Sequence, residues 1–154
     1  MDISRQQLID NIRIAIEEKT DREEVLRTAV EMLDGFSDGY NWTGVYLLEG
    51  KKLTVGPYVG PETSHTSIDL NSGICGAAAT EKKTIIIDNV NEDPRFLACS
   101  ITTRSEIVVP LMDGDLCLGE IDIDSDRPSF FGTQDRQMVE AIATTVVQRL
   151  KLIE

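Results

Sequence analysis

The sequence predicts a mixed α/β (α+β) fold, in which a central antiparallel sheet is flanked by helices from the N- and C-terminal ends of the chain. Two pairs of apolar runs are each joined by a short turn, Glu49-Gly50-Lys51 in the first pair and Asp113-Gly114-Asp115 in the second. Short turns of this kind connect neighbouring antiparallel strands. Amphipathic helical patterns open and close the chain. A length of 154 residues suits one hydrophobic core, so we expect a single domain over residues 1–154.

Three amphipathic helices are expected, two at the start of the chain and one at its end. Residues 4–19 place apolar side chains on one face, and Ser4 is a good N-cap residue. Residues 21–33 show the same pattern, and Gly35 provides a stop. The last helix is expected from Thr133 to the end of the chain, because apolar residues recur there at helical spacing. These apolar faces could pack on one another or on a second subunit.

The longer strands are expected on either side of the two short turns. Residues 42–48 and 52–60 form the first predicted hairpin, and residues 105–112 and 116–124 form the second. The run TIIIDNV at residues 84–90 is continuously apolar at its start, which is typical of a buried strand.

Shorter elements and loops are expected between the two hairpins. Residues 61–67 are polar and favour a surface loop, and residues 68–70 favour a brief strand. A short, Ala-rich helix is expected over residues 73–80, with Ser72 at its N-cap. Residues 91–104 contain a proline and no clean period, so we expect a long connection, and long loops in compact domains are often functional.

Charge and composition exclude several functions. The formal net charge of −12 argues against a nucleic-acid backbone or an anionic membrane as partner, because both repel such a surface. No apolar run approaches the roughly 20 residues that span a bilayer. The N-terminus lacks the apolar stretch of a signal peptide, so we expect a cytoplasmic protein. An odd number of cysteines without a CxxC pair argues for thiols rather than a structural disulfide framework.

Two cysteines are candidates for thiol chemistry. Cys75 lies near a predicted helix N-terminus, where the helix dipole is expected to stabilise a thiolate and lower its pKa, although it could also be a small packing residue. Cys99 lies in a polar, irregular segment, and Arg95 and Arg104 could favour its thiolate, unless it is merely an exposed thiol. Together the two could act as a nucleophile and a resolving thiol. Cys117 alternates with leucines in a strand and is expected to pack there.

Carboxyl groups recur at every second position of the last strand. Glu120, Asp122 and Asp124 therefore point to one face, and Glu106, on the partner strand, could join them. One interpretation is a solvated outer face of an acidic protein. The other is a cluster that binds an ammonium group, in which crowded carboxylates raise one another's pKa, so that one stays protonated and acts as a general acid.

Aromatic residues and a lone histidine complete the set of candidates. Trp42 and Tyr46 share one strand face, where core packing is the default and an aromatic wall for a ligand methyl or thioether is the functional alternative. His65, Cys75 and Cys99 offer metal-ligand types, but their spacing matches no familiar zinc pattern. We therefore expect no metal site from these three residues, and a solvated loop histidine at position 65.

Several segments in one order resemble a known family. The chain contains NWTGVYLL, GICGAAAT, NVNEDPRFLACS, SEIVVPL and GEIDIDS. In this combination it resembles the GAF-domain free methionine-(R)-sulfoxide reductases over about residues 38–150. The resemblance implies a GAF fold, with a central antiparallel sheet and helices, that is often dimeric through its helical face.

The resemblance also implies roles for individual residues. Cys99 would be the catalytic nucleophile and Cys75 its disulfide partner. The substrate-binding and pocket-lining residues would be Glu106, Asp122, Asp124, Trp42 and Tyr46. The substrate would be free methionine sulfoxide, thioredoxin or a similar dithiol would recycle the enzyme, and no metal or organic cofactor would be needed.

One position departs from the family. Well-known members carry a further cysteine ten residues before the cysteine of GICG, and this chain has His65 there. Cys75 would then have to resolve the sulfenic acid of Cys99. Two alternatives remain open at this point: a stand-alone GAF module that binds or senses a small molecule without turnover, and a thiol redox switch without a substrate.

Overall fold

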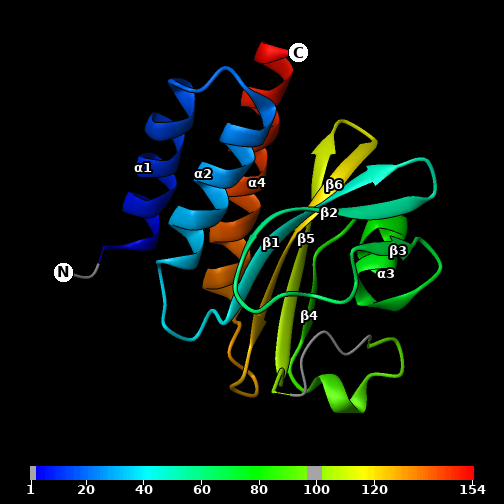
Figure 1. The fold of residues 1–154 in the computed structure, drawn as a ribbon. Helices are drawn as coiled ribbons and strands as arrows, with labels where there is room; N and C mark the ends of the chain where they lie inside the picture. The colour runs from blue at the N-terminus through cyan, green and yellow to red at the C-terminus, as the bar shows by residue number, and fades with distance from the viewer. Residues whose placement is uncertain (1–2, 97–101) are drawn as a thin grey trace.

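The structure is a computed structural model, and it describes residues 3–96 and 102–154. The helices are α1 (Arg5–Glu17), α2 (Arg22–Asp34), α3 (Gly73–Glu81) and α4 (Thr133–Ile153), with a short 3₁₀ helix, η1 (Val90–Glu92). The strands are β1 (Trp42–Glu49), β2 (Lys52–Val59), β3 (Ser67–Asp69), β4 (Ile85–Ile87), β5 (Ser105–Asp113) and β6 (Leu116–Ser125). Figure 1 shows this chain as a curved sheet with helices on both sides.

One six-stranded sheet forms the centre of the molecule, with the order β3-β2-β1-β6-β5-β4. All neighbouring strands in it run antiparallel. The predicted hairpins are confirmed as β1–β2 and β5–β6, and the second turns at Gly114, whose φ of +60° suits glycine. Because β1 pairs with β6, the two hairpins join into one sheet through their first and last strands.

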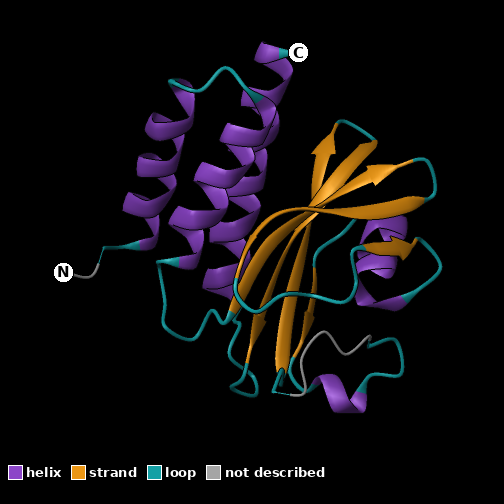
Figure 2. Ribbon diagram, viewed as in Figure 1, coloured by secondary structure: helices purple, strands orange, loops and turns teal. Residues whose placement is uncertain are grey.

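The terminal helices lie together on one face of the sheet, as the sequence predicts (Figure 2). α2 and α4 pack on that face and α1 packs on both of them, whereas the short α3 covers the opposite face. Ser4 begins α1 with a capping box, because its hydroxyl accepts from the Gln7 N–H at 3.1 Å while the Gln7 side chain accepts from the Ser4 N–H. Within residues 3–96 and 102–154, no helix is both long and apolar enough to cross a membrane.

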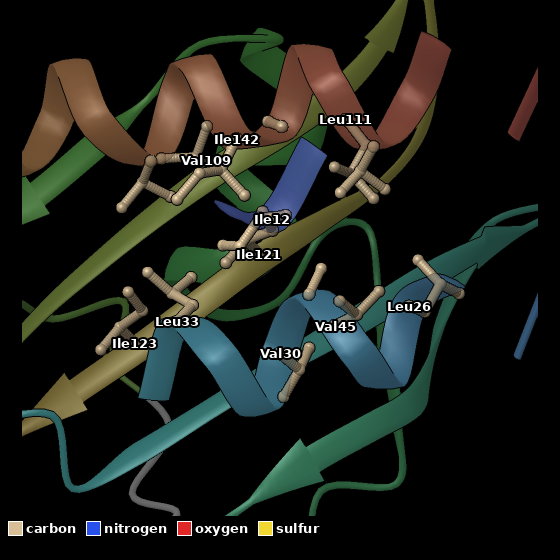
Figure 3. Close-up of a cluster of buried hydrophobic side chains, with 14 of the residues drawn as sticks. Ile12, Leu26, Val30, Leu33, Val45, Val109, Leu111, Ile121, Ile123 and Ile142 are labelled. Carbon is tan, nitrogen blue, oxygen red and sulfur yellow. The ribbon is translucent and has the colours of Figure 1, made fainter. Parts of the chain in front are cut away.

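An apolar core fills the space between the sheet and the three terminal helices. Figure 3 shows side chains of both layers pointing toward one another. Its labelled residues are Ile12, Leu26, Val30, Leu33, Val45, Val109, Leu111, Ile121, Ile123 and Ile142. We call this side of the sheet the bundle face. Its buried residues are nearly all aliphatic, and this burial supplies the main apolar driving force for folding.

The opposite side of the sheet, which we call the α3 face, has a different composition. Its smaller buried cluster includes Trp42 and Tyr46 of β1, Cys75 of α3, and Cys117 of β6. Cys117 packs as predicted, and its thiol donates to the Gly119 carbonyl at 3.2 Å.

The main local error of the sequence prediction is the length of the strand expected over residues 84–90. Only Ile85–Ile87 form a strand, and Ile86 and Ile87 are half-buried. β4 lies at the edge of the sheet and pairs with β5 alone, so it has one neighbour rather than two. The chain then turns into η1, where the Asn89 side chain accepts from the Asn91 N–H. A continuous apolar run alone does not distinguish an edge strand from a central one.

Candidate active site

A row of carboxyl groups lies on the α3 face of β6. Glu120, Asp122 and Asp124 all point to this face, because their neighbours Ile121 and Ile123 enter the core of the bundle face. The three acidic residues are 0%, 1% and 3% exposed. The interpretation of a solvated outer face is therefore wrong, and a buried acidic cluster is present.

Glu106 of β5 joins the row from the neighbouring strand. It lies directly opposite Asp124 in the β5–β6 register and is also buried. Burial raises the pKa of Glu106, Glu120, Asp122 and Asp124 well above the ordinary values, and their mutual repulsion adds to the effect. Such groups hold protons at a pH at which exposed carboxyl groups are ionised. The rise in pKa therefore has the predicted direction, but burial rather than crowding is its largest cause.

Cys75 faces the middle of this row from α3. Its Sγ donates to Asp122 Oδ2 at 3.6 Å, and one ligand atom each of Cys75, Glu106 and Asp122 lies within 4.8 Å of the others. Burial raises the pKa of the Cys75 thiol, and the charges of Asp122, Glu120 and Glu106 raise it further. The expectation that the helix dipole lowers this pKa is wrong. A short helix cannot outweigh a fully desolvated sulfur beside several carboxylates.

Several buried polar atoms of the site lack hydrogen-bond partners within residues 3–96 and 102–154. They are both carboxyl oxygens of Glu120, Oδ1 of Asp122, Oδ1 of Asp124 and Nε1 of Trp42. Buried polar atoms are almost always hydrogen-bonded in folded proteins, and leaving one unpaired costs about 1–3 kcal/mol. A group of unpaired acceptors on one face therefore indicates a place for a cationic or proton-donating ligand.

Aromatic rings form a wall at the β1–β2 side of the row. The Trp42 ring stacks on Tyr46 with centroids 6.0 Å apart and on Tyr58 at 5.2 Å. Gly44 lies between Trp42 and Tyr46 on the strand, and a Cβ there would meet the Trp42 ring at 2.5 Å. The Tyr46 hydroxyl donates to the His65 carbonyl at 3.1 Å, which ties the polar loop over residues 61–66 to the wall.

A small cavity of about 30 Å³ lies at the Asp124 end of the row. Its lining residues are Asn41, Trp42, Pro61, Thr63, Thr102, Thr103, Asp124 and Asp126. Thr63 and Thr103 are buried, so the cavity has hydroxyl groups as well as a carboxylate and an indole. A cavity of this volume has room for about one water molecule.

The structure brings most of the predicted site residues together. These are Cys75, Glu106, Asp122, Asp124, Trp42 and Tyr46. Cys99 falls in residues 97–101 and so lies outside the described residues. The described residues nearest to that segment border the site, because Phe96 packs on the cluster of the α3 face and Thr102 lines the cavity.

The roles that the resemblance implies omit two residues of the site. Tyr58 pairs with Gly44 across β1–β2 and completes the ring stack. Glu120, which the strand pattern alone places in the acidic cluster, has both oxygens buried and unpaired within the described residues. Its period-two spacing with Asp122 was the available signal. His65, expected to be a solvated loop residue, is half-buried.

Known proteins resemble this chain in sequence and in fold. The model of the GAF domain matches residues 21–150. A free methionine-R-sulfoxide reductase of Saccharomyces cerevisiae is 36% identical over 110 residues, which are 69% of this chain and 61% of that protein. This chain thus spans about three fifths of the length of that curated relative.

Solved structures show the same likeness over most of the chain. The free methionine-R-sulfoxide reductase of Neisseria meningitidis, in complex with its substrate, superimposes with a TM-score of 0.92 and 28% identity, covering 97% of this chain and 89% of that one. The type II enzyme of Thermoplasma acidophilum gives a TM-score of 0.80 and 34% identity, covering 86% of this chain and 97% of that one.

Proposed function

Because this chain belongs to the GAF domain family, and within it to the free methionine-R-sulfoxide reductases, we propose that it reduces free L-methionine-(R)-sulfoxide to methionine. The observation that carries the proposal is the buried row of four carboxyl groups, with unpaired oxygens, that faces Cys75 and an aromatic wall. The solved relative with its substrate supports the same choice of ligand.

The acidic row accounts for a preference for the free amino acid. A free methionine sulfoxide carries an α-ammonium group, and a carboxylate is the natural partner of such a buried cation. Inside a polypeptide the same nitrogen is an uncharged amide, which would leave a buried carboxylate unpaired. The stacked rings of Trp42 and Tyr46 offer an apolar surface for the methyl and sulfur end of the molecule.

The chemical step is proposed to begin at Cys99. Its thiolate attacks the sulfoxide sulfur and forms a bond between Cys99 Sγ and that sulfur, while a carboxylic acid, from Glu106, Asp122 or Asp124, gives a proton to the oxygen. The S–O bond breaks and the oxygen takes a second proton and leaves as water. Water then attacks Cys99 Sγ, the sulfur–sulfur bond breaks, methionine leaves with a proton released, and Cys99 is a sulfenic acid. Sulfur of the substrate gains two electrons and Cys99 loses them. The raised pKa of the buried carboxyl groups supports a proton held ready at neutral pH.

Cys75 is proposed to resolve the sulfenic acid. Its thiol attacks the sulfur of oxidised Cys99, a disulfide forms, and hydroxide leaves as water with a proton. Thioredoxin or a similar dithiol then reduces the disulfide. Because the pKa of Cys75 is raised, the attack needs a base, and Asp122 Oδ2 already accepts from this thiol. Cys75 takes this role because His65 stands where well-known members carry a third cysteine.

The assembly is proposed to be a homodimer through its helices, in the cytoplasm. Large apolar side chains are exposed at Ile14 of α1 and Leu152 of α4, at 54% and 77%. Covering such side chains is a common reason for association. Sedimentation velocity of the wild type and of Ile14→Glu with Leu152→Glu tests this. A dimer that becomes a monomer in the double variant supports the helical interface, and an unchanged dimer places the interface elsewhere.

The decisive experiment follows NADPH consumption with thioredoxin and its reductase. Free methionine-R-sulfoxide, its S epimer and a peptide-bound sulfoxide are compared, with Cys99→Ser, Cys75→Ser and the matched control Cys117→Ser. We expect turnover of the free R epimer alone, abolished in Cys99→Ser and retained in Cys117→Ser. Full activity of Cys99→Ser would overturn the scheme, whereas normal cycling of Cys75→Ser would remove only the resolving role.

A second candidate is a binding module without turnover, and His65 is the observation that favours it. If no turnover occurs with thioredoxin or with dithiothreitol, calorimetry with free methionine sulfoxide separates the possibilities. Binding without turnover would establish a binding module. If neither binding nor turnover is detected, free methionine sulfoxide is not the ligand of this protein.

A further inference from the structure

Three side chains of the site converge in a way that suits a metal ion. Cys75 Sγ and one carboxyl oxygen each of Glu106 and Asp122 lie within 4.8 Å of one another, and all three residues are buried. The second oxygen of Asp122 and both oxygens of the neighbouring Glu120 have no hydrogen-bond partner among the described residues. These atoms lie on a side of the sheet that holds four buried carboxyl groups.

We propose that the reduced protein binds one zinc-like divalent cation through Cys75, Glu106 and Asp122. The geometry of the first pair already suits zinc. A tetrahedral ion with a sulfur ligand at about 2.3 Å and an oxygen ligand at about 2.0 Å separates the two ligand atoms by about 3.5 Å. The observed separation of Cys75 Sγ and Asp122 Oδ2 is 3.6 Å.

The other two coordination positions of the ion require small movements of side chains. The Glu106 oxygen lies within 4.8 Å of the other two ligand atoms, and a flexible glutamate side chain has to close about 1 Å to reach the same tetrahedron. Glu120 lies one β-pleat from Asp122 and its free oxygens, or a water molecule, can fill the fourth position. This set differs from the His65, Cys75 and Cys99 combination that the sequence suggested on residue type.

The ligand types indicate which ions the site favours. A thiolate selects zinc, cadmium or cobalt over magnesium and calcium, which prefer oxygen ligands alone. Two carboxylates and one thiolate also supply more negative charge than a divalent ion carries. The cation would therefore relieve the repulsion among the buried groups as it displaces their protons.

This inference rests on the proposed function for its biological meaning, since the ion would occupy the place of the substrate ammonium. Zinc would then be a competitive inhibitor rather than a cofactor. Oxidation of Cys75 to a disulfide removes the sulfur ligand, so turnover and zinc binding exclude each other. The reductase would be blocked where free zinc is high and active where free zinc is low.

Cobalt(II) absorption spectroscopy tests the binding itself without any turnover. The protein is reduced, freed of small thiols and titrated with cobalt, then with zinc in competition. We expect a sulfur-to-cobalt charge-transfer band that saturates at one ion per chain, persists in Cys117→Ser and disappears in Cys75→Ser. Asp122→Asn should weaken cobalt binding by about tenfold or more. An excess of magnesium should not displace the bound cobalt.

Several outcomes would overturn the proposal. They are the absence of a charge-transfer band in the wild type, a band that survives Cys75→Ser, or a band lost with Cys99→Ser but not with Cys75→Ser. Thermal unfolding without zinc shows whether each variant is folded. Zinc should then raise the melting temperature of the wild type and of Cys117→Ser but not of a folded Cys75→Ser.

Failure of this inference and failure of the proposed function are distinguishable. Cobalt binding without methionine sulfoxide turnover would support the metal site and contradict the reductase function. Turnover without cobalt binding would support the reductase function and contradict the metal site. If both hold, zinc should raise KM for the sulfoxide and leave kcat unchanged, and a fall in kcat alone would contradict competition with the substrate.

Discussion

The two faces of the sheet are built from the same strands and have opposite chemistry. On β6, Ile121 and Ile123 enter the aliphatic core of the bundle face, while Glu120, Asp122 and Asp124 enter the α3 face. The bundle face buries apolar surface against α2 and α4, and α1 packs on these two helices. The α3 face buries carboxyl groups whose oxygens are left unpaired.

This difference shows how one sheet can both stabilise the protein and hold a reactive site. Burying unpaired carboxyl groups is unfavourable, and each such oxygen costs free energy that the folded state has to offset. The aliphatic side chains at alternate positions of the same strands supply the offset. Variants of one face should therefore change stability alone, and variants of the other should change stability and activity together.

The largest effect is expected from a cavity in the bundle face. Ile142 of α4 is fully buried in that core, and Ile142→Ala should lower the free energy of unfolding by about 2–5 kcal/mol. Urea denaturation measures this loss. Activity per folded molecule should stay the same, because Ile142 belongs to the core of the bundle face and not to the α3 face cluster. A variant that folds fully but loses activity would show that the faces are coupled.

A crowded glycine on the α3 face should give the next largest effect. A Cβ at Gly44 would meet the Trp42 ring at 2.5 Å and the Tyr58 Cβ at 2.6 Å. Gly44→Ala should therefore lower stability by about 1–3 kcal/mol and also raise KM for the sulfoxide, since the ring stack has to shift. Steady-state kinetics and urea denaturation are compared with Gly50→Ala, which has open space around its Cβ but the left-handed φ of +64°.

That comparison separates backbone strain from displaced rings. Gly50→Ala should lower stability through its positive φ without changing KM, because the β1–β2 turn is remote from the site. An unchanged KM in Gly44→Ala would mean that the aromatic wall does not touch the substrate.

The pH dependence of stability should report the buried carboxyl groups directly. Their folded-state pKa values are raised, so above the unfolded values the folded chain holds more protons than the unfolded chain. The free energy of unfolding must then fall as pH rises, by about 1.4 kcal/mol per pH unit for each extra proton. Urea denaturation between about pH 5 and about pH 8, with EDTA present, measures this slope.

Asp122→Asn provides the control for this slope, because it removes one titrating group and keeps the shape of the side chain. Its stability should depend less on pH than that of the wild type, and at the alkaline end it should be the more stable protein. A wild-type stability that rises through this pH range would contradict the assigned direction of the pKa shifts.

The sequence predicted the layers of this fold because its signals are periodic and local. Two hairpin turns and three amphipathic helices fix the order of elements, and the alternation in residues 116–124 places the carboxyl groups on one face. Periodicity could not say whether that face meets water or protein. Burial of the acidic row depends on α3 and on the loop over residues 61–66, which pack there from distant parts of the chain.

The error at Cys75 has the same origin. A helix N-terminus is visible in GICG, but the pKa of its thiol depends on which groups lie across the sheet from it. Asp122 is 47 residues away in sequence and 3.6 Å away in space. Tertiary proximity of this kind has no signature in local composition, whereas the apolar bundle face does.

The smallest effect expected here concerns the hydrogen bond that joins the aromatic wall to the loop over residues 61–66. Tyr46→Phe removes the bond from the Tyr46 hydroxyl to the His65 carbonyl, which should lower stability by about 0.5–1.5 kcal/mol. Hydrogen exchange should quicken in this loop and stay unchanged in α2, whose core lies on the bundle face. Faster exchange in α2 as well would mean that the two faces unfold as one unit, so that the division between a stabilising face and a reactive one would not extend to local opening.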